Sequence, residues 1–396
     1  MLVVAQMAAA FANLIWKVKT MLGTGDAGVL LQENGLDVPL GDGRTAYFNY
    51  YWLRDNCPTS FDAETRERAF DIFAEAEAPR AETAAIAGGH LEITWAGSGH
   101  VTRMPLEFLN DYAAGEKRAD PANLARRPWY GDHYAKIARF SHAELIADKA
   151  HVRDWVQAML IDGVALLTGL PDTDDALLET AGLIGHVRPS YFGLTFEVKT
   201  HIKPTNLAFT SKALPLHTDL PDEDLAPGVQ FLHCRANSVE GGNSLFVDGL
   251  AVAEDFRKAY PEDFELLVSV DVPYYCEHDS FDMRSRQHVI ELDEYGNVSG
   301  VTISQHHADI FDMPQQDLDR FYPAFCRFGQ MMRNEKYLMR FRLNAGECIV
   351  FDNHRIVHGR AAYTATSGDR HLRGCYTDRG ELRSTYRVLA GEGRFK

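Results

Sequence analysis

Short apolar runs dominate the second half of the chain and predict strands. From about residue 190 onward they recur between turn-forming residues, in the segments FEVKTHI, GVQFLHCRA, NSLFVDG, HVIEL and ECIVFD. One longer segment, QQDLDRFYPAFCRFGQMMRNEK, has a helical pattern and interrupts them. Many short strands with a few helices favour a mainly β fold, namely a β-sandwich or jelly roll with helical buttresses.

The first half of the chain divides into a β-rich segment and a helical one. AYFNYYWLR and LEITWAG are aromatic and β-branched, and glycine-rich turns bound them. The polar stretch 110–132 follows as a connector, and helical patterns then flank the apolar strand VALLTGL. We therefore expect a small β-rich N-terminal domain over 27–112 and a larger domain over 130–396.

The first 26 residues fit neither a signal peptide nor a membrane span. Their apolar run is interrupted by Gln6 and Asn13, and the basic residues Lys17 and Lys19 follow it instead of preceding it. We expect residues 1–26 to be a poorly ordered extension or an over-called start, and the protein to be soluble.

The net charge and the cysteine pattern limit the kinds of partner and the cellular compartment that we expect. The formal net charge is −16 and no basic run stands out, which argues against nucleic acid and against an anionic membrane surface. The six cysteines are dispersed without a CxxC pair, as expected for reduced thiols in a cytoplasm. We expect small-molecule partners and a cytoplasmic location, and a homodimer stays open.

Few familiar catalytic motifs are present. The segment GTGDAG at 23–28 fits a dinucleotide fingerprint, but the strand-like VLLQENGLDV follows it where a helix is required. No G-x-S-x-G, Walker loop, H-E-x-x-H or zinc-spaced cysteine cluster occurs. A hydrolase triad stays open, although no local motif nominates a nucleophile.

The histidines offer a metal site. In LPLHTDLP, His217 and Asp219 stand two residues apart, and on a strand such residues share a face. A second His-x-Asp pair, His307 and Asp309, lies in the loop-like ISQHHADIFDMP, and spacing does not separate the two pairs. The strand-like segments that follow Asp219 favour the first pair.

A third ligand and an arginine follow in the order typical of a non-haem iron oxygenase. Such a site uses two histidines and one carboxylate on one face of the metal. His358 lies in the apolar IVHGR segment, and Arg370 comes twelve residues later. An arginine at this offset can clamp a dicarboxylate through a bidentate ion pair.

From about residue 44 to 390 the chain resembles the γ-butyrobetaine and trimethyllysine dioxygenases, which are Fe(II)/2-oxoglutarate enzymes. The resemblance rests on blocks in the same order: YYWLRDNCP, GVALLTGL, LPLHTDLP, PGVQFLHC, EGGNSLFVDG, FDNHRIVHGR and RHLRGCYTD. It implies a small N-terminal domain and a C-terminal double-stranded β-helix, which is a jelly roll. It also implies hydroxylation coupled to conversion of 2-oxoglutarate to succinate and CO2, with ascorbate as a reductant.

The resemblance assigns residues to four roles. The implied iron ligands are His217, Asp219 and His358. Arg370 would hold the distal carboxylate of 2-oxoglutarate, and Ser244 and Asn206 would support the cosubstrate or the substrate. The aromatic cage for a trimethylammonium group falls on four aromatic residues, whose ring faces suit a cation that cannot donate hydrogen bonds: Phe192, Phe196, Phe209 and Tyr376.

Two departures from the family pattern stand out. Only Cys57 and His100 fall on the four N-terminal zinc positions, where Thr59 and Asp62 take the other two, so we expect zinc to be absent. The segment SQHH at 304–307 replaces an asparagine pair that faces the acidic end of γ-butyrobetaine.

His306 and His307 of this segment suit a more highly charged anion, and one branch of the family hydroxylates a trimethylammonioalkyl phosphonate. Carboxylate and phosphonate substrates are therefore both open. A trimethyllysine hydroxylase and a non-catalytic jelly-roll binding protein are the alternative functions.

Overall fold

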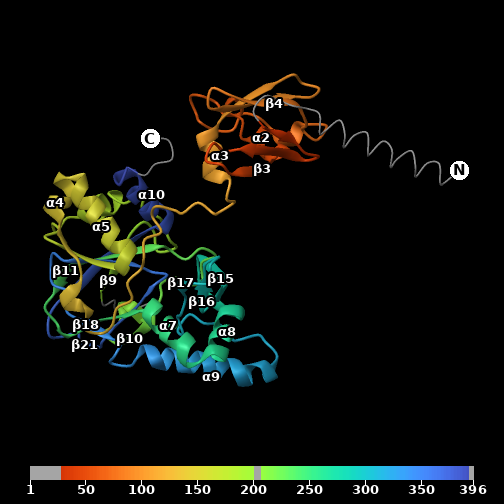
Figure 1. Cartoon of the computed structure of the whole chain (residues 1–396). Coiled ribbons are helices and arrows are strands. Elements are labelled where there is room, and N and C mark those ends of the chain that lie inside the picture. The colour runs from red at the N-terminus through yellow and green to blue at the C-terminus, as the bar shows by residue number, and fades with distance from the viewer. Residues whose placement is uncertain (1–27, 200–206, 392–396) are drawn as a thin grey trace. The chain divides into compact units, whose positions relative to one another are not determined.

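The computed structural model describes residues 28–199 and 207–391, and it divides into two compact units, Met1–Arg118 and Ala119–Lys396 (Figure 1). The expected extension over residues 1–26 lies outside the described residues, as does the expected cosubstrate contact Asn206.

The first unit contains two antiparallel three-stranded sheets. One has the order β1-β2-β3 and the other the order β4-β5-β6. A shared apolar core joins them, with Leu36 of the first sheet and Leu91, Ile93 and Trp95 of the second buried together. The strands are β1 (Leu30–Leu31), β2 (Gly35–Pro39), β3 (Thr45–Asn49), β4 (Ala81–Ala87), β5 (His90–Trp95) and β6 (Val101–Pro105).

Part of the aromatic segment AYFNYYWLR is a helix and not a strand. Strand β3 ends at Asn49, whose side-chain oxygen accepts hydrogen bonds from the backbone N–H groups of Tyr51 and Trp52. This N-cap starts helix α2 (Tyr50–Asp55), which buries Tyr50 and Leu53. The aromatic composition favoured a strand, but the cap decides the local structure. Helix α3 (Leu106–Tyr112) and the short 3-10 turns Pro58–Ser60 and Ile72–Ala74 complete the unit.

The second unit is a sandwich of two sheets, which confirms the expected jelly roll. The larger sheet has the order β7-β8-β19-β11-β22-β9 and the smaller sheet the order β10-β20-β13-β18. One apolar cluster contains residues of both, among them Leu166, Phe246, Phe351 and Leu372, so the sheets face each other. The strands of the larger sheet are β7 (Arg139–Ser141), β8 (Val164–Thr168), β9 (Phe196–Val198), β11 (Val229–Asn237), β19 (Cys348–Asp352) and β22 (Arg370–Thr377); those of the smaller are β10 (Leu214–His217), β13 (Ser244–Asp248), β18 (Met339–Phe341) and β20 (Ile356–Arg360).

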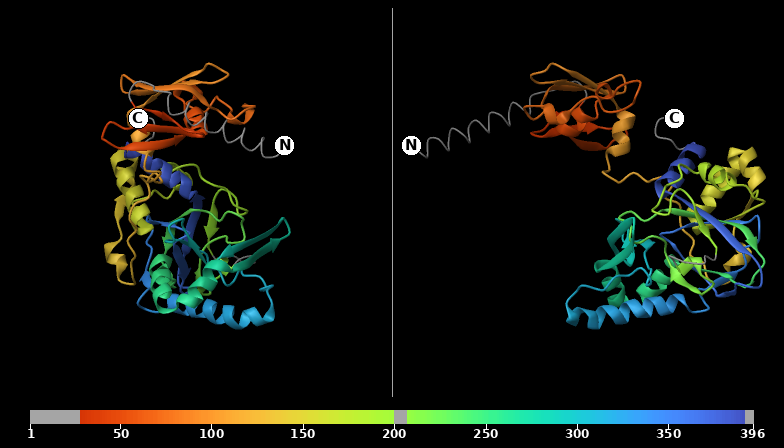
Figure 2. Two further views of the ribbon diagram at one scale, coloured as in Figure 1. Left: turned by 45° about the vertical axis from the view of Figure 1, so that its right-hand side comes forward. Right: turned by 180° about the vertical axis from the view of Figure 1, so that it is seen from behind.

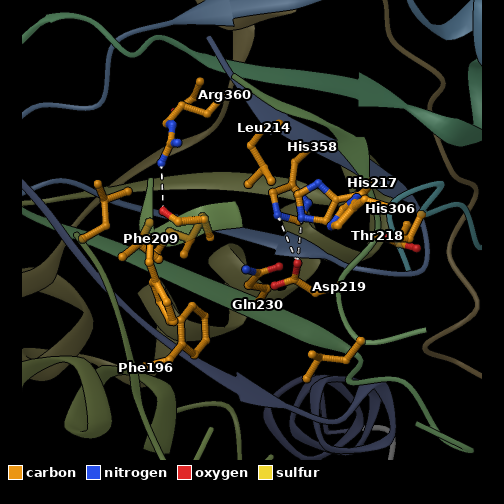
Figure 3. A pocket seen from close by; sticks show the side chains of 18 of the residues that line it. Phe196, Phe209, Leu214, His217, Thr218, Asp219, Gln230, His306, His358 and Arg360 are labelled. Atoms are coloured by element: carbon orange, nitrogen blue, oxygen red, sulfur yellow. Dashed lines mark hydrogen bonds and ion pairs between the residues drawn. The ribbon is translucent and has the colours of Figure 1, made fainter. Parts of the chain in front are cut away.

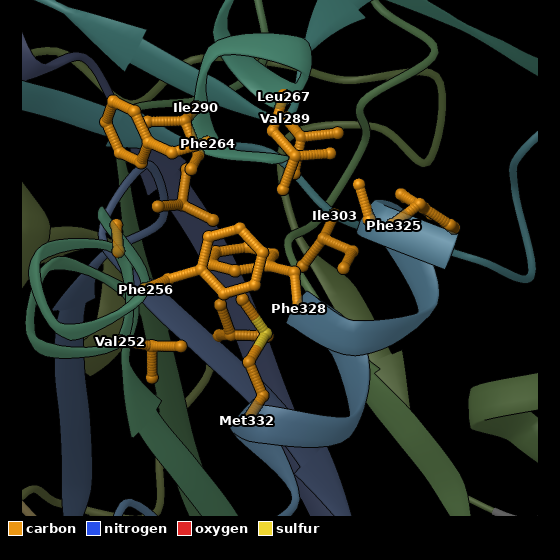
Figure 4. Packing of buried hydrophobic residues seen from close by; sticks show 14 of the residues in the cluster. Val252, Phe256, Phe264, Leu267, Val289, Ile290, Ile303, Phe325, Phe328 and Met332 are labelled. Atoms are coloured by element: carbon orange, nitrogen blue, oxygen red, sulfur yellow. The ribbon is translucent and has the colours of Figure 1, made fainter. Parts of the chain in front are cut away.

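Helices support the sandwich on two sides (Figures 1 and 2). Trp155 and Leu382 pack with Phe231 and Val350 of the larger sheet. A second group of helices has an apolar core of its own. Figure 4 shows Phe256 and Phe328 side by side in this core. The first group of helices is α4 (His142–Ala147), α5 (Lys149–Asp162), α6 (Ala176–Gly182) and α10 (Arg379–Leu389); the second is α7 (Gly249–Ala259), α8 (Pro261–Ser269) and α9 (Gln315–Met332).

The remaining elements of this unit are two hairpins, one strand pair and two 3-10 turns. They are the hairpins β14 (Asp271–His278) with β15 (Phe281–His288) and β16 (Ile290–Leu292) with β17 (Val298–Val301), the pair β12 (Glu240–Gly241) with β21 (Tyr363–Thr364), and the 3-10 turns His133–Lys136 and Leu207–Phe209. Among the described residues, no helix has the length and apolar character that crossing a membrane requires.

A buried ion pair anchors the turn that leads into β20. The Arg355 guanidinium donates from Nε and from one terminal nitrogen to the two oxygens of Asp248, at 2.9 Å each. Both side chains are almost fully buried. The Asp248 carboxylate also accepts from the backbone N–H of Trp129 at 3.0 Å. The pair therefore fixes the start of the strand that carries His358.

We predict that Asp248→Asn lowers the free energy of unfolding by about 3–5 kcal/mol, because it leaves the buried Arg355 charge without its hydrogen-bonded counter-ion. Denaturant titration of the purified variant measures this difference. The matched control is Asp132→Asn, which breaks an exposed ion pair with Lys136 and should leave stability near the wild-type value. Equal stabilities of the two variants would contradict the prediction.

Candidate active site

Three potential metal ligands meet on the inner side of the smaller sheet. Strand β10 pairs with β20 in a register that places His217 directly opposite His358. The Oδ1 atom of Asp219 lies 3.0 Å from Nε2 of His217 and 3.6 Å from Nε2 of His358 (Figure 3). All three potential ligand atoms lie within 4.8 Å of one another.

The way in which Asp219 joins this group differs from the expectation. Strand β10 ends at His217, so Asp219 lies in the loop beyond it, and the next residue, Leu220, has a positive φ of 54°. The shared face of His217 and Asp219 is therefore a property of the loop and not of strand alternation.

Hydrogen bonds hold the Asp219 loop in place. The Asn353 side chain accepts from the backbone N–H of Asp219 at 2.8 Å and donates to its carbonyl at 3.0 Å. The Tyr376 hydroxyl donates to Oδ2 of Asp219 at 2.7 Å. Burial, followed by the neighbouring carboxylate charge, raises the pKa of Tyr376 well above its usual value, so the hydroxyl keeps its proton. Asp219 Oδ1 thus remains the oxygen that faces the histidines.

The two histidines present Nε2 toward the site in a form suited to metal binding. His217 donates from Nδ1 to the Pro215 carbonyl at 2.8 Å, which leaves Nε2 as the ring nitrogen that faces the site. Burial, followed by the charge of neighbouring His217, lowers the pKa of His358 to about 3, so its imidazole is neutral. Two imidazoles and one carboxylate are the ligands of a facial-triad iron site, and the residues present fit that metal.

The second His-x-Asp pair does not form such a site. Asp309 is exposed, and His307 bonds instead to Asp222, with Nδ1 and Oδ1 2.8 Å apart. Asp222, His307 and Cys276 form a separate cluster of potential ligand atoms within 4.8 Å of one another.

A pocket surrounds the metal ligands, and Arg370 lies in its wall. Ser244 on β13 and Arg360 on β20 line the same pocket. Arg370 is buried, and its Nε and one terminal nitrogen have no hydrogen-bond partner among the described residues. Burial, followed by the charge of Arg360, lowers the pKa of Arg370 to about 10, which still leaves it charged at neutral pH. A buried, charged guanidinium with two donor atoms that lack partners among the described residues fits a carboxylate ligand.

The four expected cage residues line this pocket with their rings close together. The ring centroid of Phe192 lies 6.4 Å from the centroid of Phe196 and 6.4 Å from the centroid of Phe209. Phe196 in turn stacks on Tyr376, with a centroid distance of 5.0 Å. Figure 3 shows Phe196 and Phe209 on the side of the pocket away from the metal ligands. The structure thus brings these aromatic residues together in one wall.

The SQHH segment lines another part of the pocket. The ring centroids of His306 and His217 lie 4.9 Å apart, and Figure 3 shows the two rings side by side. Ser304 Oγ and His306 Nδ1 are buried without a hydrogen-bond partner among the described residues. His307 also lines the pocket. This wall therefore offers polar atoms for a ligand.

Sequence reasoning missed three polar residues of the site. Gln230 is almost fully buried in the pocket wall, and its Oε1 has no partner among the described residues. Asn353 holds the Asp219 backbone, and Asp222 holds His307. Gln230 and Asn353 stand inside blocks that carry the family resemblance, GVQFLHC and FDNHR, which is the signal that could have identified them. Asp222 follows LPLHTDLP directly and carries no such signal.

Cys57 and His100, which the resemblance places at two of the zinc positions, lie close together in the first unit. Cys57 Sγ lies 3.5 Å from His100 Nε2 and 3.1 Å from Thr59 Oγ1. A threonine hydroxyl is a poor zinc ligand, since structural zinc sites use thiolates, imidazoles and carboxylates. The absence of zinc stays a prediction. Elemental analysis of the purified protein tests it, and one tightly bound zinc per chain, lost in Cys57→Ala, would contradict it.

Comparison with known proteins identifies the family. Residues 128–376 match the model of the taurine catabolism dioxygenase TauD, TfdA family, so the chain belongs to it. The protein is an Fe(II)/2-oxoglutarate-dependent dioxygenase, as the sequence predicted.

Individual relatives are similar over nearly their whole length. The chain is 35% identical to the gamma-butyrobetaine dioxygenase of Pseudomonas sp. (strain AK-1), over 90% of this chain and 94% of that protein. It is 30% identical to the human gamma-butyrobetaine dioxygenase, over 85% of this chain and 90% of that protein. It is 27% identical to the mitochondrial trimethyllysine dioxygenase of Bos taurus, over 86% of this chain and 82% of that protein.

Proposed function

We propose that the protein hydroxylates a small acid that bears a trimethylammonium group, with 2-oxoglutarate as cosubstrate. The acid is a carboxylate of the γ-butyrobetaine type or a phosphonate of the 2-(trimethylammonio)ethylphosphonate type. The observation that carries the proposal is the wall of four aromatic rings in the same pocket as His217, Asp219 and His358. The gamma-butyrobetaine dioxygenases among its relatives support the same substrate class.

The aromatic wall suits a quaternary ammonium group for a simple reason. Three methyl groups leave the nitrogen without a hydrogen to donate, so carboxylates and carbonyls gain little from it. Ring faces attract the cation electrostatically, at roughly 0.5–2 kcal/mol for each desolvated ring. Phe192, Phe196, Phe209 and Tyr376 provide these faces within one wall.

Each side chain then has a defined task. His217, Asp219 and His358 would hold the iron, which supplies the oxidation chemistry when it is bound. Arg370, with Ser244 nearby, would bind the distal carboxylate of 2-oxoglutarate and fix its orientation. The cage sets the distance from the nitrogen to the carbon that reacts, and this distance decides which C–H bond is oxidised.

Hydroxylation of trimethyllysine is the second candidate, because trimethyllysine dioxygenases are also relatives. That substrate adds an α-ammonium group, which would have to lie near the histidine-rich SQHH wall. That wall presents imidazole rings to the pocket. The nearby Asp222 carboxylate, which could attract an ammonium group, is buried behind His307. The wall therefore favours a simple anion over an amino acid.

Succinate formation with a substrate panel tests the proposal. The panel contains γ-butyrobetaine, 2-(trimethylammonio)ethylphosphonate and trimethyllysine, each with Fe(II), 2-oxoglutarate and ascorbate. We expect one of the first two to stimulate succinate formation, with a hydroxylated product in equal amount. No stimulation by any of the three would favour a non-catalytic ligand-binding protein, and activity that survives EDTA would favour a hydrolase.

We further propose that the protein acts in the cytoplasm and needs neither nucleic acid nor a membrane. The net charge of −16 and the dispersed cysteines support this location. Light scattering of the purified protein tests whether it forms a homodimer.

A further inference from the structure

Asp222 is a buried carboxylate beside the pocket. It belongs neither to the group of potential iron ligands nor to the aromatic cage. It follows Asp219 by three residues, and its side chain is fully buried. Its Oδ1 bonds to Nδ1 of His307 at 2.8 Å, across 85 residues of sequence. His307 lines the pocket, so the pair joins the protein interior to the substrate space.

A buried carboxylate is costly unless a positive charge compensates it. Of the described residues, only His307 places a basic nitrogen at hydrogen-bond distance from Asp222. Nearby Arg188 pairs with Glu223 and Asp378 instead. His307 is therefore the described residue that is placed to compensate the charge of Asp222.

The other neighbours of Asp222 are weak acids and cannot provide the compensating charge. Burial, followed by the Asp222 charge, raises the pKa of the Tyr191 hydroxyl and of the Cys276 thiol. Both groups thus stay protonated and neutral beside the carboxylate. They complete its surroundings without changing the net charge.

The backbone keeps His307 in position. The His307 carbonyl accepts from the N–H of Tyr275 at 2.9 Å, and the N–H of Asp309 donates to the Pro273 carbonyl at 2.9 Å. Strand β14 therefore holds the segment that carries the ring. Because Nδ1 donates to Asp222, Nε2 is the ring nitrogen left for a ligand. In an imidazolium Nε2 carries a proton and is a charged donor.

His306 lacks this arrangement. Its Nδ1 is buried without a partner among the described residues, and its ring neighbours are His217 and His307 rather than an acid. The two adjacent histidines therefore differ in their hydrogen-bond partners, although the sequence presents them as equivalent.

We propose that Asp222 is a positioning residue that keeps His307 as an imidazolium with Nε2–H directed into the pocket, and that this cation binds the acidic group of the substrate. The inference rests on the proposed function and deepens it. The aromatic wall selects the trimethylammonium end, and the Asp222–His307 pair selects the negative charge at the other end. An uncharged analogue such as the carboxamide would bind without that ion pair.

Asp222→Asn tests the pair, because it keeps the shape and removes the charge. The substrates are the acid that wild type turns over best and its carboxamide. The KM for the acid should rise about 10- to 100-fold, the loss expected for a hydrogen bond to a charged group. The preference of wild type for acid over carboxamide should fall by the same factor. The KM for 2-oxoglutarate, which the Arg370 region binds, should stay unchanged.

The matched control is Asp224→Asn, an exposed carboxylate two residues along, which should behave as wild type. His307→Gln is the second variant, and it should lose the same selectivity even if Asp222→Asn folds poorly. The double variant should be no worse than His307→Gln alone, since the two residues act as a unit. A general loss of structure would instead lower kcat with both substrates and shift the KM for 2-oxoglutarate.

Three outcomes would overturn the inference while the proposed function stands. They are an unchanged preference for acid over carboxamide in Asp222→Asn, an unchanged preference in His307→Gln, and a second metal equivalent in wild type that Asp222→Asn lacks. The last would mean that a metal at Asp222, Cys276 and His307 compensates the carboxylate. Absence of turnover of every trimethylammonium acid by wild type would refute the proposed function itself.

Discussion

Asp219→Ala should reduce substrate-coupled succinate formation by about 1,000-fold or more, because a metal centre supplies several kcal/mol of the stabilisation that the reaction needs. Asp219 is the one anionic member of the group that it forms with His217 and His358. Without its negative charge, the two imidazoles alone bind a dication far more weakly. Succinate release and the iron content after dialysis measure the two consequences separately.

The sequence offers a matched control for this experiment. Asp309→Ala removes the carboxylate of the second His-x-Asp pair, which is exposed. It should leave both iron content and turnover near wild type. If Asp309→Ala and Asp219→Ala had equal effects, or if Asp219→Ala kept its iron, the assignment of the metal site would be wrong.

Arg370→Met should raise the KM for 2-oxoglutarate by about 100- to 1,000-fold, because truncating one partner of a buried, hydrogen-bonded charge pair costs about 2–5 kcal/mol. Arg370 is the buried guanidinium with unpaired donors in the pocket wall. Methionine keeps the apolar stem and removes the charge and the donors. Initial rates at varied 2-oxoglutarate measure the effect.

Arg340→Met is the charge-matched control, because Arg340 is exposed and pairs with Glu335 on the surface. It should leave the KM for 2-oxoglutarate unchanged. A wild-type KM in Arg370→Met would mean that another residue, such as nearby Arg360, holds the cosubstrate.

The sequence predicted the architecture because its signals are local. Apolar runs between turn residues correspond to strands β11, β13 and β19, and the long amphipathic segment is helix α9. The exception is instructive. YYWLRD has the composition of a strand, but Asn49 caps its first N–H groups and a helix forms. Composition reports average preference, and a single side-chain hydrogen bond can outweigh it.

The metal site was only partly determined by local signals. Spacing did not separate His217 and Asp219 from the pair His307 and Asp309. The β10–β20 register separates them, because it places His358 opposite His217, 141 positions earlier in the chain, and leaves Asp309 exposed. Cross-strand register depends on the whole sheet, and no window of sequence contains it.

The sequence by itself determined the class of chemistry: the ligand types, the arginine that follows them, the aromatic residues and the order of the blocks that carry the family resemblance. The tertiary structure decided which residues act as partners. It paired Asp219 with Asn353 and Tyr376, and it paired Asp222 with His307. The physical reason is that a buried charge is tolerable only where a partner lies within hydrogen-bond distance. Such partners come from distant segments, and only the folded chain brings them together.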